Sequence, residues 1–268
     1  MRAVPLRSLT CILACAVALG AAAPARAESA LLLPVPSAFG VIPASTYDES
    51  GRRVGDAHLI VERLGGGNVR IFAESGFEGA ERNVVSAVLE PAEDGRALRL
   101  LEQSSRSFDA EGHGLGVLSV DHAAAEGRCD PPSGNGSERK VLALPERDRV
   151  ANIPVNLLFL PLARGEREQV TFQVLLCGGG PRLVTARAQV ARRVRTEDGL
   201  RDIVEIQYDM DFGPVLSRLA RPFVPKLSVW FDPGVPDGWL AHRMPLFAKG
   251  PTVMVVRTGI SPDALGAP

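Results

Sequence analysis

One stretch, Gln169–Met210, constrains the fold of this chain more than any other. Apolar residues occupy every second position in three consecutive segments of it, and mostly polar residues fill the positions between. Gly178-Gly179-Gly180 follows the first segment and Asp198-Gly199 the second, and both are typical of tight reversals. Alternation of period two places successive side chains on opposite faces of a pleated strand. The stretch therefore predicts a meander of three antiparallel strands with one apolar and one solvated face.

The remainder of the chain has turn signals about every 8–12 residues, which is typical of an all-β domain. Further strands are expected at Asp56–Leu64, Val69–Phe77, Asn83–Glu90, Ala97–Ser107, Leu115–Val120, Lys226–Phe231, Trp239–Phe247 and Pro251–Thr258. Glu126–Lys140 is rich in Gly, Pro, Ser and charge and is expected to form an exposed loop.

Two segments break the β pattern and predict short helices. Val150–Leu162 is almost continuously apolar, with Asn152 as a possible cap and Pro154 in the first turn, although a buried strand has the same pattern. Phe212–Phe223 has apolar residues at helical spacing. The expected fold class is mainly β: a strongly curved antiparallel sheet or incomplete barrel, with these two helices covering its concave face.

The N-terminus has the pattern of a secretory signal peptide at residues 1–27. Leu9–Ala23 is apolar, and Ala25-Arg26-Ala27 is a small-x-small cleavage site. Lipidation of Cys15 and an uncleaved anchor are the alternatives. The sequence then predicts an irregular leader at 28–44, a single β-rich domain at 45–258 and a flexible tail at 259–268. It also predicts a periplasmic or secreted location, with no transmembrane span after cleavage.

Cys129 and Cys177 are the two cysteines beyond the leader. In an oxidising compartment they are expected to form a disulfide, with two free thiols as the alternative. The charge is nearly balanced, with 30 Lys and Arg against 31 Asp and Glu, and no polybasic run is present. This balance argues against a nucleic-acid partner.

No catalytic motif is present, so the protein is expected not to be an enzyme and to need no cofactor or metal. The chain lacks the H-E-x-x-H and G-x-S-x-G patterns and the lysine of a phosphate-binding loop. Asp109, His113, Asp121 and His122 form a local group of possible metal ligands, but without a specific spacing they favour a solvated turn. Glu205 and Asp209 could pair as acid and base, although a solvated strand face is commoner.

The inward face of the meander combines small and large residues, which leaves two interpretations. Either the two helices fill the space above Ala186 and Ala188, or part of that space stays open as an apolar cavity for a lipid or acyl chain. The cavity interpretation predicts a lining of Phe172, Val174, Ala186, Ala188, Ile206, Tyr208, Leu216 and Leu219.

Three features carry a resemblance: Tyr47-Asp48 and Gly55 before the first hairpin, the segment 152–158 before the meander, and Gly250-Pro251 before the last strand. In these the chain resembles a family of secreted, β-rich bacterial proteins that carry only a domain-of-unknown-function label. That family is distantly similar to the periplasmic lipoprotein carriers, whose curved sheets are plugged by helices over an apolar cavity. The resemblance implies a periplasmic protein that handles a lipid or other apolar ligand. The alternative is a structural or interaction partner in a cell-envelope assembly, with a closed core and no ligand.

Overall fold

The computed structural model of the chain describes residues 30–132, 138–178, 180–195, 202–213, 227–235, 237–247 and 250–265. These residues form one large antiparallel sheet, one α-helix and three 3₁₀ turns. The strands are β1 Leu33–Pro34, β2 Gly40–Tyr47, β3 Arg53–Arg63, β4 Val69–Gly76, β5 Arg82–Pro91, β6 Ala97–Phe108, β7 Gly114–Asp121, β8 Glu126–Asp130, β9 Lys140–Ala143, β10 Gln169–Leu176, β11 Arg182–Arg195, β12 Asp202–Asp211, β13 Leu227–Phe231, β14 Trp239–Pro245 and β15 Thr252–Arg257. The helix is α1, Val155–Ala163, and the 3₁₀ turns are η1 Gly65–Gly67, η2 Arg147–Arg149 and η3 Asp263–Leu265.

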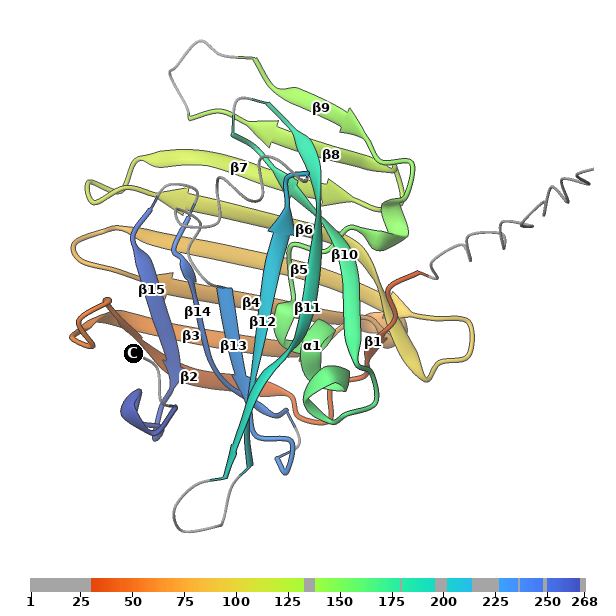
Figure 1. Ribbon diagram of the computed structural model, residues 1–268. Helices are drawn as coiled ribbons and strands as arrows, with labels where there is room; N and C mark the ends of the chain where they lie inside the picture. The colour runs from red at the N-terminus through yellow and green to blue at the C-terminus, as the bar shows by residue number, and fades with distance from the viewer. Residues whose placement is uncertain are drawn as a thin grey trace, which may run out of the picture.

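The sheet is continuous from β10 through β15 to β2 and on to β9, and it does not close into a barrel. From β2 to β9 and from β10 to β15, strands that are neighbours in sequence pair antiparallel, and β1 pairs with β6. The last strand, β15, pairs with β2 through partners such as Arg257 and Ala44. The opening therefore lies between β9 and β10, and we call it the seam. In Figure 1, β2–β7 run across the view while β10–β15 run nearly vertically in front of them. The two halves of the sheet face each other across a shared apolar core.

The predicted meander is confirmed as β10, β11 and β12. The inward residues Phe172, Ala186 and Ile206 are each at most 1% exposed. The opposite face of β11 is solvated as expected, because Thr185, Arg187 and Gln189 are exposed. The alternating pattern thus predicted the inward face of all three strands and the solvated face of β11 correctly.

The outer face of β12 is not solvated as expected. Ile203 lies in a second apolar cluster with Trp230 of β13 and Leu265 of η3. Leu265 is 2% exposed, and its carbonyl oxygen accepts a hydrogen bond from Arg192 at 2.9 Å. The expected flexible tail at 259–268 therefore holds a packed turn, because its one buried leucine covers an apolar patch outside the sheet.

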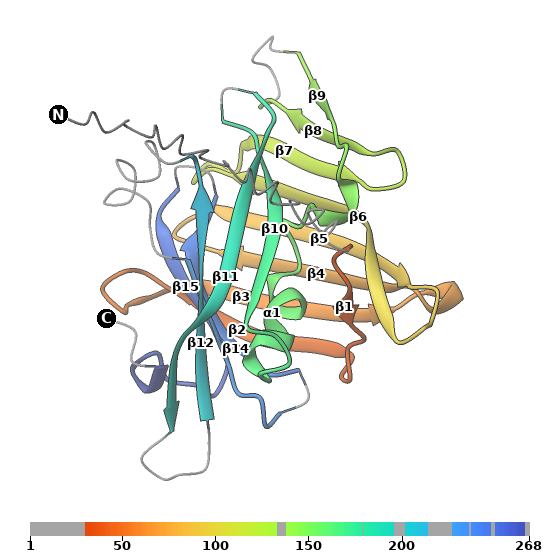
Figure 2. The same ribbon diagram turned by 45° about the vertical axis from the view of Figure 1, so that its right-hand side comes forward.

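The single α-helix of the described residues, α1, lies between the two halves of the sheet (Figure 2). Leu157–Ala163 are all buried, so the helix has no solvated face and is held by packing rather than by amphipathicity. The Phe159 ring lies 5.7 Å from the Phe172 ring and 5.3 Å from the Tyr208 ring. The second helix was expected at Phe212–Phe223. Apart from Phe212 and Gly213, that range lies outside the described residues.

Three further expectations differ from the structure. The segment 28–44 is not irregular throughout, because it contains β1 and the start of β2. Glu126–Lys140 was expected to be a loop, yet β8 occupies its first part and β9 begins at its last residue. Asn152 does not cap α1: the N-cap position is Pro154, which has no side-chain cap hydrogen bond.

Candidate functional site

A cavity of about 670 Å³ lies between the two halves of the sheet. The N-terminal end of α1 forms one wall of it through Val155 and Asn156. The rest of α1 packs over β10–β12 and fills the neighbouring space. Apolar lining comes from both halves of the sheet: Leu59, Ile71, Ala73, Val85, Val174, Tyr208, Met210, Leu227, Met244, Phe247 and Val255.

The cavity contains two of the eight predicted lining residues. Val174 and Tyr208 line it. Phe172, Ala186, Ala188 and Ile206 are instead buried in the core beside α1. Leu216 and Leu219 lie outside the described residues. The closed-core interpretation thus holds above Ala186 and Ala188, where α1 fills the space. The open-cavity interpretation holds next to the first turn of α1, where the cavity lies.

A polar group on β4–β6 interrupts the apolar lining. It consists of Ser75, Asn83, Ser105 and Ser107, all lining the cavity, and we call it the serine–asparagine cluster. The Ser105 and Ser107 hydroxyls donate to Asn83 Oδ1 at 3.1 and 3.2 Å. None of these four residues was among the predicted site residues, although Ser105 and Ser107 share a period-two face with the buried Gln103, a pattern that indicates an inward polar face.

His242 lines the same cavity from β14. Its neighbours across the sheet, Val229 and Val255, are core residues, and its ring lies 5.8 Å from the Trp239 ring. Burial lowers the pKa of His242 to about 4, because the charged form is poorly solvated there. The imidazole is therefore neutral near pH 7 and adds no charge to the cavity.

The cavity meets solvent beside the seam. Its exposed lining residues are Leu115, Glu138 and Lys140, from β7 and the start of β9. The Cys129–Cys177 disulfide also lines the cavity here and confirms the predicted bridge. It joins β8, the neighbour of the edge strand β9, to the residue that follows the edge strand β10, so a covalent bond crosses the seam where the described strands form no ladder of hydrogen bonds.

The seam is filled by the connection between β9 and β10. Val150 forms a parallel bridge with Gln173, and the Ala151 N–H donates to the Gln173 carbonyl at 2.8 Å. The Asn152 side chain then pairs with the backbone of Leu175, donating to its oxygen at 2.8 Å and accepting from its N–H at 3.0 Å. The edge strand β10 is thereby covered, which is one way that proteins protect a free sheet edge.

Gln103 of β6 anchors this connection from inside the protein. Its Oε1 accepts from the backbone N–H of Asn152 at 2.7 Å and of Ile153 at 2.9 Å. Its Nε2 therefore donates, to the Val150 carbonyl at 3.1 Å and to His122 Nε2 at 2.7 Å. Gln103 is 2% exposed and His122 5% exposed. His122 Nε2 must be unprotonated to accept this bond.

Acid is expected to destabilise the protein through His122. Burial lowers its pKa below the ordinary 6.5, although a hydrogen bond with the Arg147 backbone opposes the shift. Below about pH 6.5 the unfolded chain binds a proton that the folded protein excludes, so the stability falls from there down to the lowered folded pKa. Urea denaturation of His122→Asn between pH 7.5 and 5 should show a smaller slope than the wild type. Equal slopes in the two proteins would contradict the assignment.

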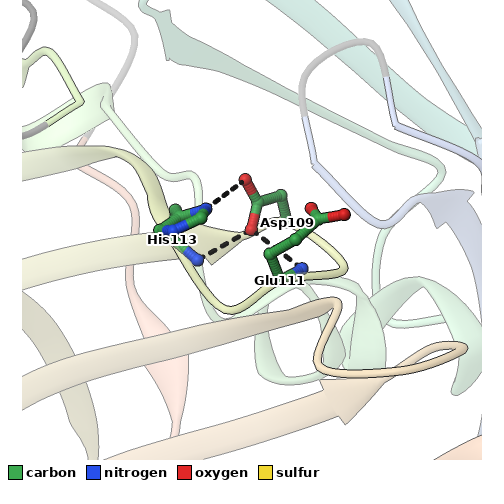
Figure 3. A group of neighbouring side chains, drawn as sticks. All are labelled: Asp109, Glu111 and His113. Carbon is green, nitrogen blue, oxygen red and sulfur yellow. Dashed lines mark hydrogen bonds and ion pairs between the residues drawn. The ribbon is translucent and has the colours of Figure 1, made fainter.

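The possible metal ligands at 109–122 do not converge. His113 lies in the turn before β7, and His122 directly follows the last residue of that strand. The described residues instead place Asp109, Glu111 and His113 together in the exposed β6–β7 turn (Figure 3). There Asp109 accepts from the backbone N–H of Glu111 and of His113, at 3.1 and 2.7 Å, and contacts the His113 ring at 3.3 Å. These bonds shape the turn.

The two carboxylates considered for acid–base chemistry also separate. Glu205 is 9% exposed and lies 3.1 Å from Arg192, and its Oε1 accepts from the Ser228 hydroxyl at 3.0 Å. Asp209 is exposed. Glu205 is thus held in an ion pair on the outer face of the sheet, away from the cavity.

Fold and cavity together define a mainly β protein with one open antiparallel sheet and an internal, mostly apolar cavity. None of the helices described here is long and apolar enough to cross a membrane. No protein-family model matches the chain, and no curated protein matches its sequence.

One solved structure with a detectable likeness is that of a β-barrel-like protein with a domain of unknown function, DUF1849, from Brucella abortus. The alignment covers 84% of this chain and 97% of that protein, at 9% sequence identity and a TM-score of 0.37. A likeness at that level supports no inference about function. The expected similarity to periplasmic lipoprotein carriers stays a prediction.

Proposed function

We propose that this protein is an exported, periplasmic binding or carrier protein that holds a lipid or another apolar ligand between the two halves of its sheet. The observation that carries the proposal is the cavity of about 670 Å³. Small-molecule sites typically measure roughly 300–1,000 Å³ and have mostly apolar walls with a few polar groups. The cavity matches that description in size and in lining, and it suits a single-chain or drug-sized molecule.

The role we propose is binding rather than catalysis. The cavity lining includes His242, which is neutral near pH 7, but no second titratable group is bonded to it among the described residues. Nucleophilic catalysis needs a nucleophile and an activating base within hydrogen-bond reach of each other. Apolar walls instead favour a ligand that is transferred from water by the hydrophobic effect.

Two features support export. The N-terminal 27 residues have the pattern of a signal peptide, and the disulfide requires an oxidising compartment to form and persist. A periplasmic location satisfies both requirements.

Filling the cavity is expected to abolish ligand uptake. Ala73 is half-buried on the cavity wall, so Ala73→Trp places an indole in the space that the ligand would occupy. Saturable uptake of the neutral dye N-phenyl-1-naphthylamine should fall at least tenfold. The control Val41→Trp adds the same ring at a site that is 64% exposed on β2, and it should leave uptake unchanged.

Lipid extraction followed by mass spectrometry of the purified wild type provides an independent test. Co-purification of an apolar molecule that Ala73→Trp lacks would support binding. An empty wild type with no saturable dye uptake would overturn the proposal. That result would favour a structural or interaction role in an envelope assembly, for which the unpaired outer edge of β9 among the described strands is suited.

A further inference from the structure

The inward face of β4–β6 changes from apolar to polar along its length. On β4 the inward residues run from Ile71 through Ala73 to Ser75. On β5 and β6 the same change ends at Asn83 and Ser107. Ser75 is the cross-strand partner of Asn83, and Asn83 is the partner of Ser107, so the polar ends lie side by side. One end of the cavity wall is therefore a continuous hydrogen-bonding surface.

The internal bonds of the serine–asparagine cluster leave part of it unused. Asn83 Oδ1 already accepts from two hydroxyls. Its Nδ2 carries two N–H donors and forms no hydrogen bond with another described residue. The Ser75, Ser105 and Ser107 oxygens keep free lone pairs. The cluster thus offers both donors and acceptors to a ligand.

The four side chains of the cluster are uncharged, and none of them is bonded to a charged side chain among the described residues. The Lys, Arg, Asp and Glu residues of the described lining are Asp130, Glu138 and Lys140; Asp130 is paired with Arg139, and Glu138 and Lys140 are exposed. Serine hydroxyls and a primary amide can satisfy neutral oxygen groups such as hydroxyls and ester carbonyls. Burying an ionised carboxylate or phosphate without a paired cation costs several kcal/mol.

On the basis of the proposed function, we infer that the cavity takes a single-chain amphiphile with an uncharged, oxygen-rich headgroup, such as a monoacylglycerol. The headgroup lies on the serine–asparagine cluster. The chain lies against the apolar lining, which includes Leu59, Phe247 and Val255. The walls alone would accept any apolar chain, so the cluster is what determines the headgroup.

Dye displacement tests this specificity. The competitors are 1-monododecanoylglycerol and dodecanoate at pH 7.5, which share one chain and differ in headgroup charge. The wild type should bind the monoacylglycerol at least tenfold more tightly. Asn83→Leu should lose about tenfold in monoacylglycerol affinity, the effect of one or two hydrogen bonds, while its dye affinity changes less than twofold.

A second variant covers the possibility that Asn83→Leu misfolds. The double substitution Ser105→Ala and Ser107→Ala removes two hydroxyls with little change in volume, and it should also reduce the preference. The control, Ser86→Ala with Ser104→Ala, changes a cross-strand pair on the outward side of the same strands and should have no effect. Two results would overturn the inference. One is that the protein binds the dye but has equal affinity for the monoacylglycerol and for dodecanoate; the other is that its preference for the monoacylglycerol persists in both cluster variants. Failure to bind dye and both amphiphiles would overturn the proposed function itself.

Discussion

Removing the Cys129–Cys177 disulfide should lower the free energy of unfolding by about 4 kcal/mol. The bond spans 48 residues of sequence, and the chain-entropy relation gives roughly that value for a loop of this length. In this relation the stabilisation arises in the unfolded chain, because the bond holds together two residues that could otherwise move far apart. In the folded protein the bond joins β8 to the end of β10, and the described strands leave β8 and β10 without a shared ladder of hydrogen bonds.

Urea denaturation of the double variant Cys129→Ser with Cys177→Ser measures this loss. Reduction of the wild type with dithiothreitol should give the same decrease in stability, whereas the double variant should not respond to the reductant. Dye should also leave the variant faster, since the disulfide lines the solvent opening of the cavity. A stability loss below about 1 kcal/mol would show that the packed connection alone holds the seam.

Gln103→Leu should destabilise the protein by about 3–5 kcal/mol, since each buried polar group left unpaired costs about 1–3 kcal/mol. The substitution removes the acceptor for the Asn152 and Ile153 N–H groups. It also removes the donor to the Val150 carbonyl and to His122. Leucine is close to glutamine in volume, so the loss reports hydrogen bonding rather than a cavity in the core.

Gln173→Leu is the matched control, with the same substitution on the edge strand beside the same connection. The Gln173 side-chain oxygen is buried without a hydrogen-bond partner. Its replacement should therefore leave stability unchanged or raise it by up to about 1 kcal/mol. Equal losses in the two variants, measured by urea denaturation, would contradict the anchoring role of Gln103.

The sequence predicted the strands wherever a local repeat defined them. The three central strands, the hairpins of β3–β6 and the closing strands β13–β15 lie within a few residues of their expected positions. Cys129 and Cys177 were also paired correctly. Each of these depends on alternation, turn residues or cysteine number, all of which can be read from neighbouring residues.

The strand β8 shows why other parts were missed. The Gly, Pro, Ser and charged residues of Glu126–Lys140 suggested a loop, but Gly127 is buried on β8, and a Cβ there would lie 2.9 Å from Leu175 Cδ2. The glycine is required because β10 packs closely across the seam. Leu175 was expected on the less buried face, yet it is 0% exposed in a cluster with Val120, Leu144 and Val150. Both errors concern contacts between residues far apart in the sequence.

By itself, the sequence determined the inward face of the central strands, because side-chain alternation is a local property of an extended chain. It also determined that small inward residues beside large ones would have to be covered. Only the tertiary structure decided where the sheet stays open, which part of the inner face α1 fills and where the cavity and its serine–asparagine cluster remain. Those outcomes depend on how distant strands meet, and a strand's own pattern specifies that it is buried without specifying its partner.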